Sequence, residues 1–280
     1  MSVEQERFQI VASIVLFNHS YEQVEDTLTS LLNEQCVGKI VLINNGGSDW
    51  AASLGNERIS YIHSAVNGGF GHGHNLSMKR YLDSCDYFLI CNPDISFDVG
   101  ALAQLHHFAC EGGHQFVSPR IRYSDSRFQY SCRLLPSPAN LFLRRFLPKW
   151  GARSDVDYEL QKADYNKTFA VPSVSGCFML LKSELLSQLG GFDERYFMYL
   201  EDVDLCRRAL KLTDIIYYSG TTITHVFGKG SYKSLILLRY HIHSAILYFN
   251  KWGWFFDRER CHYNQKYLKT IPMASVHDGL

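Results

Sequence analysis

Short, continuously apolar segments, each followed by a polar turn, constrain the fold of this chain more than any other feature. The clearest are 9–17 (QIVASIVLF), 39–43 (KIVLI) and 87–91 (YFLIC), with a shorter one at 59–62. Strands that are covered on both faces of a parallel sheet have this pattern. The intervening segment 21–34 has apolar residues at helical spacing. Strands that alternate with helices predict an α/β fold whose central sheet is mostly parallel and flanked by helices.

The second half of the chain continues this alternation less regularly. A strand is expected within 174–181, a helix over 201–211 and another strand at 214–218, and the tail from 233 to about 260 has the pattern of a helical segment. Residues 120–170 show no clear period. A chain of 280 residues supports one large domain, or one domain with an appendage.

Composition argues against several classes of protein. Lys+Arg and Asp+Glu both number 28, so no overall charge favours nucleic acid as a partner. The eight cysteines form no CxxC pair and no zinc-type cluster with histidine, which predicts free thiols in a reducing compartment. The polar N-terminus MSVEQERFQI has no apolar signal core, and no apolar segment reaches 18 residues. We therefore expect a cytoplasmic protein, soluble or peripheral on the inner face of the cell membrane.

Four side chains lie where a sheet of this kind carries its chemistry. Asp94 directly follows a predicted strand, and a carboxylate there can hold a divalent ion against a diphosphate, although Asn-Pro-Asp is also an ordinary turn. His225 follows another strand and is either a metal ligand or a structural residue. Glu201 and Asp202 begin a predicted helix behind an aromatic run. One of them can act as a general base, or both can simply complement the helix dipole.

The segment NGGFGHGHN at 67–75 is predicted as a glycine-rich loop before a helix that extends to about Leu82. It resembles phosphate-binding loops only loosely, because it lacks the Lys-Ser/Thr of a P-loop and the spacing of a dinucleotide fingerprint. Its glycines would still allow the backbone to approach a nucleotide closely.

The order of these segments resembles that of family 2 glycosyltransferases with the GT-A fold, in the rhamnosyltransferase-like branch of bacterial surface polysaccharide synthesis. The matching segments are SIVLFN (13–18), IVLINNGGSD (40–49), NGGFGHGHN (67–75), FLICNPDI (88–95), VSGCFMLLK (174–182), GGFDERYFMYLEDVDLCRR (190–208) and THVFGKGS (224–231). The longest of them is highly specific, and the tail segment HSAILYFNKWGW (243–254) also fits. The resemblance covers residues from about 9 to about 260.

This resemblance implies an inverting transfer of a sugar from a nucleotide diphosphate donor to a glycan acceptor. Asp202 matches the general base, and Glu201 is its neighbour, expected to help bind the acceptor. Asp94 matches the metal-binding acid of a DxD-type motif, and Asn92 stands where many relatives have the first Asp. The implied cofactor is Mg²⁺ or Mn²⁺, held by Asp94 and His225.

The same resemblance assigns a donor pocket. Its expected residues are Phe17, Asn18, Asn44, Asn67, Gly69, His74, Asn75, Asn92 and Asp94. The first three are expected to face the nucleotide base. Many relatives have Asp where this chain has Asn44, whose amide oxygen can still accept a hydrogen bond from a pyrimidine N3–H.

The expected organisation is a GT-A catalytic domain over residues 1–232 and a C-terminal helical extension with a tail over 233–280. Within the domain, about 9–96 form the nucleotide-binding half, and about 97–232 form the acceptor and catalytic half. The branch favours dTDP-L-rhamnose as donor and a polyprenyl-diphosphate-linked glycan as acceptor, for O-antigen, capsule or cell-wall polysaccharide. UDP-linked galactose, galactofuranose and N-acetylhexosamine are the alternative donors.

A membrane surface is a further expected partner, through the stretch 141–147 and the aromatic and basic tail. The basic residues expected to meet anionic headgroups are Arg144, Arg145, Arg239 and Lys251, and the aromatic residues expected at the interface are Trp252 and Trp254. The alternative is that these aromatic residues pack the C-terminal helices onto the core.

Two other functions compete with sugar transfer. A sugar-nucleotide nucleotidyltransferase has a similar sheet, but it needs a glycine-rich, basic loop directly after the first strand, where this chain has FNHSYE (17–22). A catalytically inactive glycan-binding or assembly protein on the same scaffold is suggested by Asn92. The acids Asp94 and Asp202, together with His225, argue against that second alternative.

Overall fold

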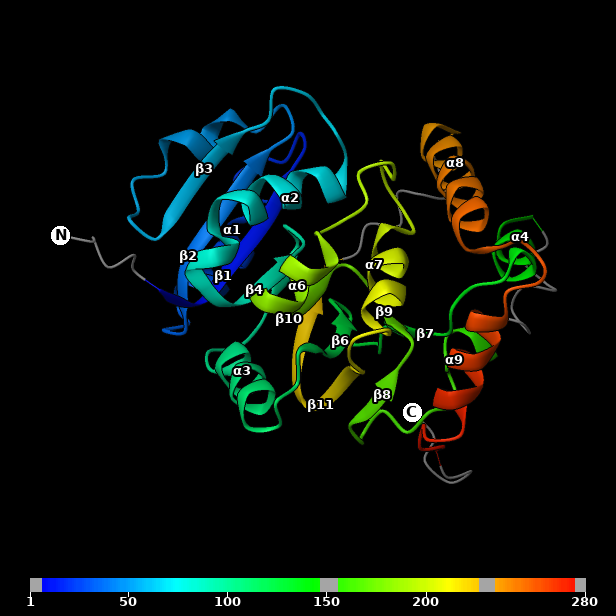
Figure 1. Cartoon of the computed structure of the whole chain (residues 1–280). Coiled ribbons are helices and arrows are strands. Elements are labelled where there is room, and N and C mark those ends of the chain that lie inside the picture. The colour runs from blue at the N-terminus through cyan, green and yellow to red at the C-terminus, as the bar shows by residue number, and fades with distance from the viewer. Residues whose placement is uncertain (1–6, 147–155, 227–234, 275–280) are drawn as a thin grey trace.

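The computed structural model describes residues 7–146, 156–226 and 235–274, with the side chains of 143–146 left out. The described residues form a nine-stranded central sheet, a small two-stranded sheet and helices on both faces of the central one (Figure 1). The strands are β1 (Phe8–Leu16), β2 (Val37–Asn44), β3 (Ile59–His63), β4 (Cys85–Cys91), β5 (Ile95–Ser96), β6 (Phe116–Tyr123), β7 (Cys132–Arg133), β8 (Phe169–Val171), β9 (Ser173–Val174), β10 (Phe178–Lys182) and β11 (Ile215–His225). The helices are α1 (Glu25–Leu32), α2 (Phe70–Tyr81), α3 (Ala101–Glu111), α4 (Pro138–Phe146), α6 (Ser183–Leu189), α7 (Glu201–Ala209), α8 (Leu235–Trp252) and α9 (Arg258–Leu268), with short 3₁₀ helices η1 (Asp49–Ser53) and η2 (Leu82–Ser84).

The topology of the sheet gathers strand ends at one edge. The order is β3-β2-β1-β4-β10-β6-β11-β5, and β8 pairs with β11. The first four strands are parallel, as the sequence predicts, and antiparallel pairing begins at β10. Since β10 is antiparallel to both β4 and β6, and β11 is parallel to β6, strands β4, β6 and β11 run in the same direction. The carboxyl ends of β1, β2, β4, β6 and β11 therefore point toward the same edge.

Two apolar layers hold helices against the sheet. In β1, residues at even positions from Ile10 to Leu16 face one layer, whereas Val11 faces the other, because successive side chains of a strand point to opposite faces. Helices α1 and α3 cover the first face, and α2, α6 and α7 cover the second. Helix α7 is thus held on the sheet along its length while its first residue lies near the edge where the strands end.

The glycine-rich segment differs from its prediction. Instead of a loop over 67–75, helix α2 already begins at Phe70, so Gly71 and Gly73 lie inside it. A Cβ at Gly71 would come within 2.8 Å of the Phe192 side chain, and one at Gly73 within 2.7 Å of Val15. These glycines are therefore needed for close packing of a helix, and the helix forms because this packing outweighs the cost of about 1 kcal/mol for each helical glycine.

Buried charges join the C-terminal helices to α7. Arg207 is 1% exposed and donates two hydrogen bonds to the Asp257 carboxylate, at 2.7 and 2.6 Å. Asp257 also caps α9 by accepting a hydrogen bond from Arg260 N at 2.9 Å. Trp252 Nε1, at the end of α8, donates to Asp204 Oδ1 at 2.8 Å. Both helices of the extension are thus fixed to the helix that begins with the predicted catalytic acids.

All eight cysteines are free thiols, as their spacing predicts. Within the described ranges, no helix is both long enough and apolar enough to cross a membrane.

Candidate active site

A cavity of about 810 Å³ opens at the edge where β4 and β11 end, β10 begins and α7 begins. One side of the cavity wall is formed by this sheet edge and by the start of α7. The other side is formed by the segment before β7 and by helices α4 and α8. Its lining includes Asn92, Gln129, Tyr130, Arg133, Leu141, Tyr158, Glu159, Gly176, Met198, Glu201, Asp202, His225, Leu237, Leu238 and His241. The cavity thus combines predicted catalytic residues with a largely apolar wall from the C-terminal extension.

The chain enters α7 through two consecutive non-glycine residues in the left-handed region. Tyr199 has φ 72° and Leu200 has φ 63°. Each such residue costs about 1–2 kcal/mol relative to ordinary helical backbone, and such strain is concentrated at functional sites. Two contacts hold this turn in place, because Ser244 Oγ of α8 donates to Met198 O at 2.8 Å and Phe70 N donates to Phe197 O at 3.0 Å. The sharp turn sets the first residues of α7 against the cavity.

Asp202 is held at the cavity wall by backbone donors on both of its oxygens. Gly176 N donates to Oδ2 at 3.0 Å, and Val203 N donates to Oδ1 at 2.8 Å. A Cβ at Gly176 would lie 3.0 Å from the Asp202 Cβ, so this approach is close to the limit for any residue other than glycine. The carboxylate is partly exposed and oriented by these contacts, and each oxygen keeps a lone pair for a substrate hydroxyl.

Glu201 faces the same cavity in a different environment. Its side chain is 6% exposed, and Oε2 is buried without a hydrogen-bond partner. Burial first, and then the charge of Asp202, raise the pKa of Glu201 well above its ordinary value of 4.5. Glu201 therefore retains a proton where an exposed glutamate would have lost it, and it can donate a hydrogen bond. A buried carboxyl group with a raised pKa, beside a second acid in one cavity, is typical of acid–base sites.

The structure brings Asp94 and His225 together at the sheet edge. His225 Nε2 lies 3.2 Å from Asp94 Oδ1 and 3.4 Å from Asn92 Nδ2. On the other side of the ring, Nδ1 donates to Gln129 Oε1 at 3.1 Å, which turns Nε2 toward Asp94. Burial lowers the pKa of His225, but the neighbouring Asp94 carboxylate and Cys177 thiol raise it more, to about 10.

Comparison with known sequences gives relatives of one kind, although no protein-family model matches the chain. It is 25% identical over 205 residues to the low-salt glycan biosynthesis hexosyltransferase Agl10 of Haloferax volcanii, a match that covers 70% of this chain and 61% of Agl10. It is 27% identical over 212 residues to the N-acetylglucosaminyl-diphospho-decaprenol L-rhamnosyltransferase of Mycobacterium tuberculosis, covering 70% and 68%. It is 26% identical over 205 residues to rhamnosyltransferase WbbL of Escherichia coli, covering 70% and 75%. The chain thus spans less than two thirds of Agl10.

Solved structures agree on the fold. GalNAc-T7 with UDP, GalNAc and Mn²⁺ matches with a TM-score of 0.59 at 12% identity, over 79% of this chain and 43% of GalNAc-T7. Residues 1–349 of S. aureus TarS match with a TM-score of 0.55 at 13% identity, over 78% of this chain and 60% of that one. The chain therefore has the fold of these GT-A structures, and its sequence relatives are named as glycosyltransferases. The predicted resemblance to the rhamnosyltransferase-like enzymes of family 2 is confirmed by its relatives.

Asp94 and His225 have donor atoms of the kinds that a divalent metal ion takes. Asp94 Oδ1 is buried and has no partner in hydrogen-bond geometry, although His225 Nε2 is 3.2 Å away. A carboxylate oxygen and an imidazole nitrogen suit Mn²⁺, and a carboxylate alone suits Mg²⁺. Among the described residues no cluster of three or more His, Cys, Asp or Glu side chains could hold a metal. The protein would therefore supply two ligands, leaving the others to donor phosphates and water.

On the expected donor side, Asn44 already has hydrogen-bond partners within the protein. This residue is fully buried, and its Oδ1 already accepts hydrogen bonds from Gly46 N at 2.8 Å and Ser48 N at 3.2 Å. Its Nδ2 donates to Asp49 Oδ1 at 2.8 Å and to Tyr61 OH at 3.1 Å. The expected contact with a pyrimidine N3–H is not open in this arrangement. Asn44 instead shapes the loop after β2 and orients the exposed Asp49.

His74 and Asn75 also serve packing rather than an open pocket. His74 is fully buried, with Nδ1 2.8 Å from Ser13 Oγ, and burial lowers its pKa to about 3. Asn75 pairs with the backbone of Phe192 in both directions, at 2.8 and 2.9 Å, and donates to Glu194 Oε1 at 2.8 Å. Both side chains fix α2 to the sheet and to the turn before α7, and neither is among the residues that line the 810 Å³ cavity.

The other expected donor residues lie at strand ends and turns. Phe17 and Asn18 are exposed after β1, and Asn18 N donates to Gly46 O at 2.8 Å. Asn67 is exposed and accepts a hydrogen bond from Gly69 N at 3.2 Å. Gly69 has φ 92°, and a side chain there would collide with Phe197 O. Of the nine expected donor residues, all of them described, Asn92 alone lines the cavity.

Sequence reasoning missed several residues of the cavity. Gln129, Tyr130 and Arg133 come from the irregular middle of the chain, and Leu237 and His241 come from α8. No motif marks the first group, because these residues precede or occupy a two-residue strand. The aromatic and apolar content of α8 could have signalled a wall of the site, but it fits packing on the core equally well.

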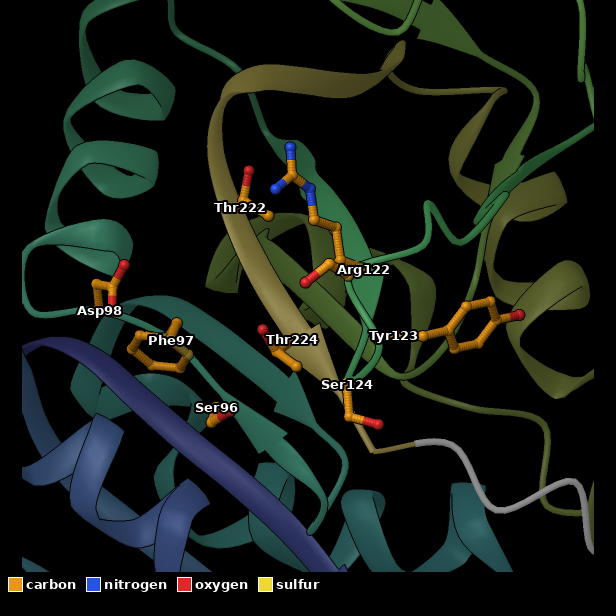
Figure 2. Close-up of a pocket in the computed structure, with 9 residues that line it drawn as sticks. Ser96, Phe97, Asp98, Arg122, Tyr123, Ser124, Thr222 and Thr224 are labelled. Atoms are coloured by element: carbon orange, nitrogen blue, oxygen red, sulfur yellow. The ribbon is translucent and has the colours of Figure 1, made fainter. Parts of the chain in front are cut away.

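A second, smaller pocket of about 340 Å³ lies between β5, β6 and β11. Figure 2 shows Arg122 beside Thr222 in it, with Thr224 and Ser124 along the same strands. Thr222 and Thr224 point to the face of β11 opposite to that of His225, because side chains alternate along a strand. This pocket has no carboxylate pair and lies behind the active-site face of β11.

The C-terminal segment divides into packed and exposed residues. Trp252, expected at a membrane interface, stacks on Arg207 at 4.3 Å besides its hydrogen bond to Asp204. Lys251 forms ion pairs with Asp193 at 2.8 Å and Asp204 at 2.7 Å. These two residues therefore pack the helices, as the alternative interpretation expects. The side chains of Arg144 and Arg145 lie outside the described residues.

Proposed function

We propose that this glycosyltransferase moves L-rhamnose from dTDP-L-rhamnose to a polyprenyl-diphosphate-linked glycan, in surface polysaccharide synthesis and with inversion at the anomeric carbon. The names of two relatives specify rhamnosyl transfer, and one of those names specifies a diphospho-decaprenol acceptor. The observation that carries the proposal is the cavity, whose wall brings together the backbone-anchored carboxylate of Asp202, the buried carboxyl group of Glu201 and the ring of His225.

Asp202 is the general base in this proposal. Its backbone-anchored carboxylate takes the proton of an acceptor hydroxyl, whose oxygen then forms a bond to the anomeric carbon. The bond from that carbon to the donor diphosphate breaks, and its electron pair leaves with the nucleoside diphosphate. Attack from the side opposite to the leaving group inverts the anomeric configuration.

Glu201 contributes a hydrogen bond instead of a second base. Because it retains its proton, it can donate to an acceptor oxygen beside the attacking hydroxyl without adding a negative charge. Asp94 and His225 would hold Mg²⁺ or Mn²⁺, and such an ion offsets the charge on the departing diphosphate.

A membrane surface is the proposed partner on the outer side of α8. Leu235, Ile242 and Ile246 share one exposed stripe of this helix with Arg239, at helical spacing. After α8, Phe255 is 77% exposed and Phe256 is 98% exposed. The opposite side of the same helix lines the cavity with Leu237 and His241, so a lipid surface on the stripe would lie close to a lipid-linked acceptor.

The function is tested with purified protein, manganese or magnesium, and a panel of donors. The panel contains dTDP-L-rhamnose, UDP-galactose, UDP-galactofuranose and UDP-N-acetylglucosamine, with an N-acetylglucosaminyl-diphospho-lipid as acceptor, and products are identified by mass spectrometry. We expect rhamnosyl transfer that EDTA abolishes. Transfer of another sugar alone would replace the donor assignment.

A binding measurement separates an inactive scaffold from an enzyme tested with the wrong acceptor. A donor at 100 times its dissociation constant adds about 2.7 kcal/mol to the free energy of unfolding. Stabilisation by a donor without hydrolysis or transfer, for every donor and acceptor tried, would favour the inactive glycan-binding protein.

A further inference from the structure

The cavity lining includes one arginine, Arg133, for which no ion pair is found among the described residues. Arg133 lies in β7, and its Nε is buried without a hydrogen-bond partner. Its backbone is fixed, because β7 pairs with β9 and Ser173 Oγ donates to Arg133 O at 3.2 Å. An unpaired charged donor that is shielded from water costs about 1–3 kcal/mol or more. A site that maintains this cost in the free protein is prepared for an anionic ligand.

Arg133 lies toward the C-terminal extension rather than the metal pair. Earlier in the same segment, Gln129 contacts His225 at the sheet edge. Directly after Arg133, Leu134 N donates to Tyr158 O at 2.9 Å, and Leu135 N donates to Asn264 Oδ1 of α9 at 2.8 Å. The segment therefore runs from the donor side to the extension, and Arg133 occupies a place near the second end.

The wall beyond Arg133 is apolar. It is formed by Leu141 of α4 and by Leu237 and Leu238 of α8, and these two helices contact each other. The cavity thus presents three kinds of surface: the carboxyl pair Glu201–Asp202, a guanidinium group and an aliphatic wall. A ligand that matches all three has a sugar hydroxyl, an anionic linker and an apolar chain.

We propose that Arg133 binds the diphosphate that links the acceptor sugar to its lipid, with the first part of the lipid chain along Leu141, Leu237 and Leu238. This inference rests on the proposed function, because it assumes a lipid-linked acceptor. A guanidinium group suits this role, since it donates paired hydrogen bonds to phosphate oxygens. Arg133 would then set the distance between the lipid linker and the sugar hydroxyl that faces Asp202.

The test compares two acceptors that differ only in the linker: dodecyl diphospho-N-acetylglucosamine and dodecyl N-acetylglucosaminide. Equilibrium binding of each, without donor, is measured for the wild type, Arg133→Gln, Arg133→Lys and the control Arg127→Gln. Arg127 is exposed and pairs with Asp125 at 2.7 Å, outside the cavity lining. We expect Arg133→Gln to weaken binding of the diphosphate acceptor about 10–100-fold, Arg133→Lys to weaken it less, and neither to change binding of the neutral acceptor more than about twofold.

Several outcomes would overturn the inference. Equal loss for both acceptors would mean that Arg133 supports the cavity structurally, and an unchanged affinity would mean that no anion binds there. A raised KM for the donor, with unchanged acceptor binding, would assign Arg133 to the donor diphosphate. Thermal unfolding checks the fold, and Arg133→Gln is expected to be at least as stable as the wild type because no hydrogen bond from the side chain is lost. Because binding is measured without donor, failure of rhamnosyl transfer alone leaves this test intact.

Discussion

The charged side chains at the two ends of helix α7 differ in how fully they are paired within the protein. At its start, Glu201 and Asp202 face a cavity, and Glu201 has a buried oxygen with no partner. Toward its other end, Arg208 donates a hydrogen bond to Asp204, which lies one turn earlier, is fully buried and also accepts a hydrogen bond from Trp252, both at 2.8 Å. One continuous run of charged residues therefore serves a site at one end and holds the fold together at the other.

This difference shows which charged groups of α7 have hydrogen-bond partners inside the protein and which face the cavity. Arg207 is enclosed by Asp257, Tyr248 and Trp252, and both of its terminal nitrogens donate hydrogen bonds to the Asp257 carboxylate. The N-terminal pair lacks such matching, although it lies only a few residues away on the same helix. Functional sites commonly violate the rule that buried polar groups are paired, and the surrounding structure compensates for the cost. In α7, the contacts of Arg207 and Arg208 at the last turn stabilise the helix and so offset the cost of the unpaired oxygen at its first turn.

The largest effect is expected for Asp202→Asn. The amide cannot take the proton of the acceptor, so kcat should fall about 10²–10⁴-fold, while the melting temperature changes by a few degrees at most. Initial rates and thermal unfolding measure the two quantities. The control is Asp204→Asn, for which the comparison predicts the reverse: a clear loss of stability and near-normal kcat per folded molecule. Full activity of Asp202→Asn would mean that Asp202 is not the general base.

Arg207→Met should destabilise the protein by about 3–5 kcal/mol. The substitution leaves the Asp257 carboxylate buried, with 2% of its side chain exposed, and without its main cationic partner. Urea denaturation gives the free energy of unfolding. The control is Arg195→Met, whose guanidinium group is 64% exposed where it pairs with Asp193, and which should change stability by no more than about 1 kcal/mol. Similar effects for both arginines would refute the distinction between a structural and a surface pair.

Glu201→Gln should change how stability depends on pH. The pKa of Glu201 is raised in the folded protein above 4.5, so the folded state binds this proton more tightly than the unfolded state. Its stabilising contribution is complete below pH 4.5 and is lost as pH rises toward the folded-state pKa, at up to about 1.4 kcal/mol per pH unit. Glutamine does not titrate, so the variant should gain stability relative to the wild type between pH 5 and 8. Parallel stability curves in urea over that range would contradict a proton on Glu201.

Periodicity predicted those parts of the fold whose partners are near in sequence or are set by strand direction. The apolar segments became β1, β2, β3 and β4, and strand-end residues came together because parallel strands end at one edge. The pairing of Asp94 with His225, 131 positions further along the chain, came instead from the family resemblance, and in the structure the two side chains lie 3.2 Å apart.

Two residues expected in the donor pocket have partners far away in sequence. His74 contacts Ser13, and Asn75 contacts Phe192 and Glu194, so polar residues of a glycine-rich segment became buried links. Nothing in the segment itself distinguishes a polar side chain that faces a ligand from one that faces another element. Arg133 was missed for a similar reason. Its place in the cavity wall, and the lack of a partner for its Nε, are visible only in the structure.

The weakest of the expected effects concerns the exposed residues that follow the packed end of the extension. Lys251 and Trp252 are locked onto α7, whereas Phe255 and Phe256 project outward only three or four positions later. If these rings enter an interface, Phe255→Ser with Phe256→Ser should lower partitioning onto anionic phosphatidylglycerol vesicles at least about tenfold, since full burial of each ring contributes about 1.5–3 kcal/mol. Cosedimentation measures the partitioning.

The matched control for that experiment is Val99→Ser, because Val99 is 73% exposed but lies before α3, on a different element. It should leave vesicle binding unchanged. Equal binding by the wild type and the double variant would mean that the exposed rings do not enter the membrane interface. Loss of binding together with unchanged kcat on a short, water-soluble acceptor would place the effect in membrane docking, separate from the chemistry at the start of α7.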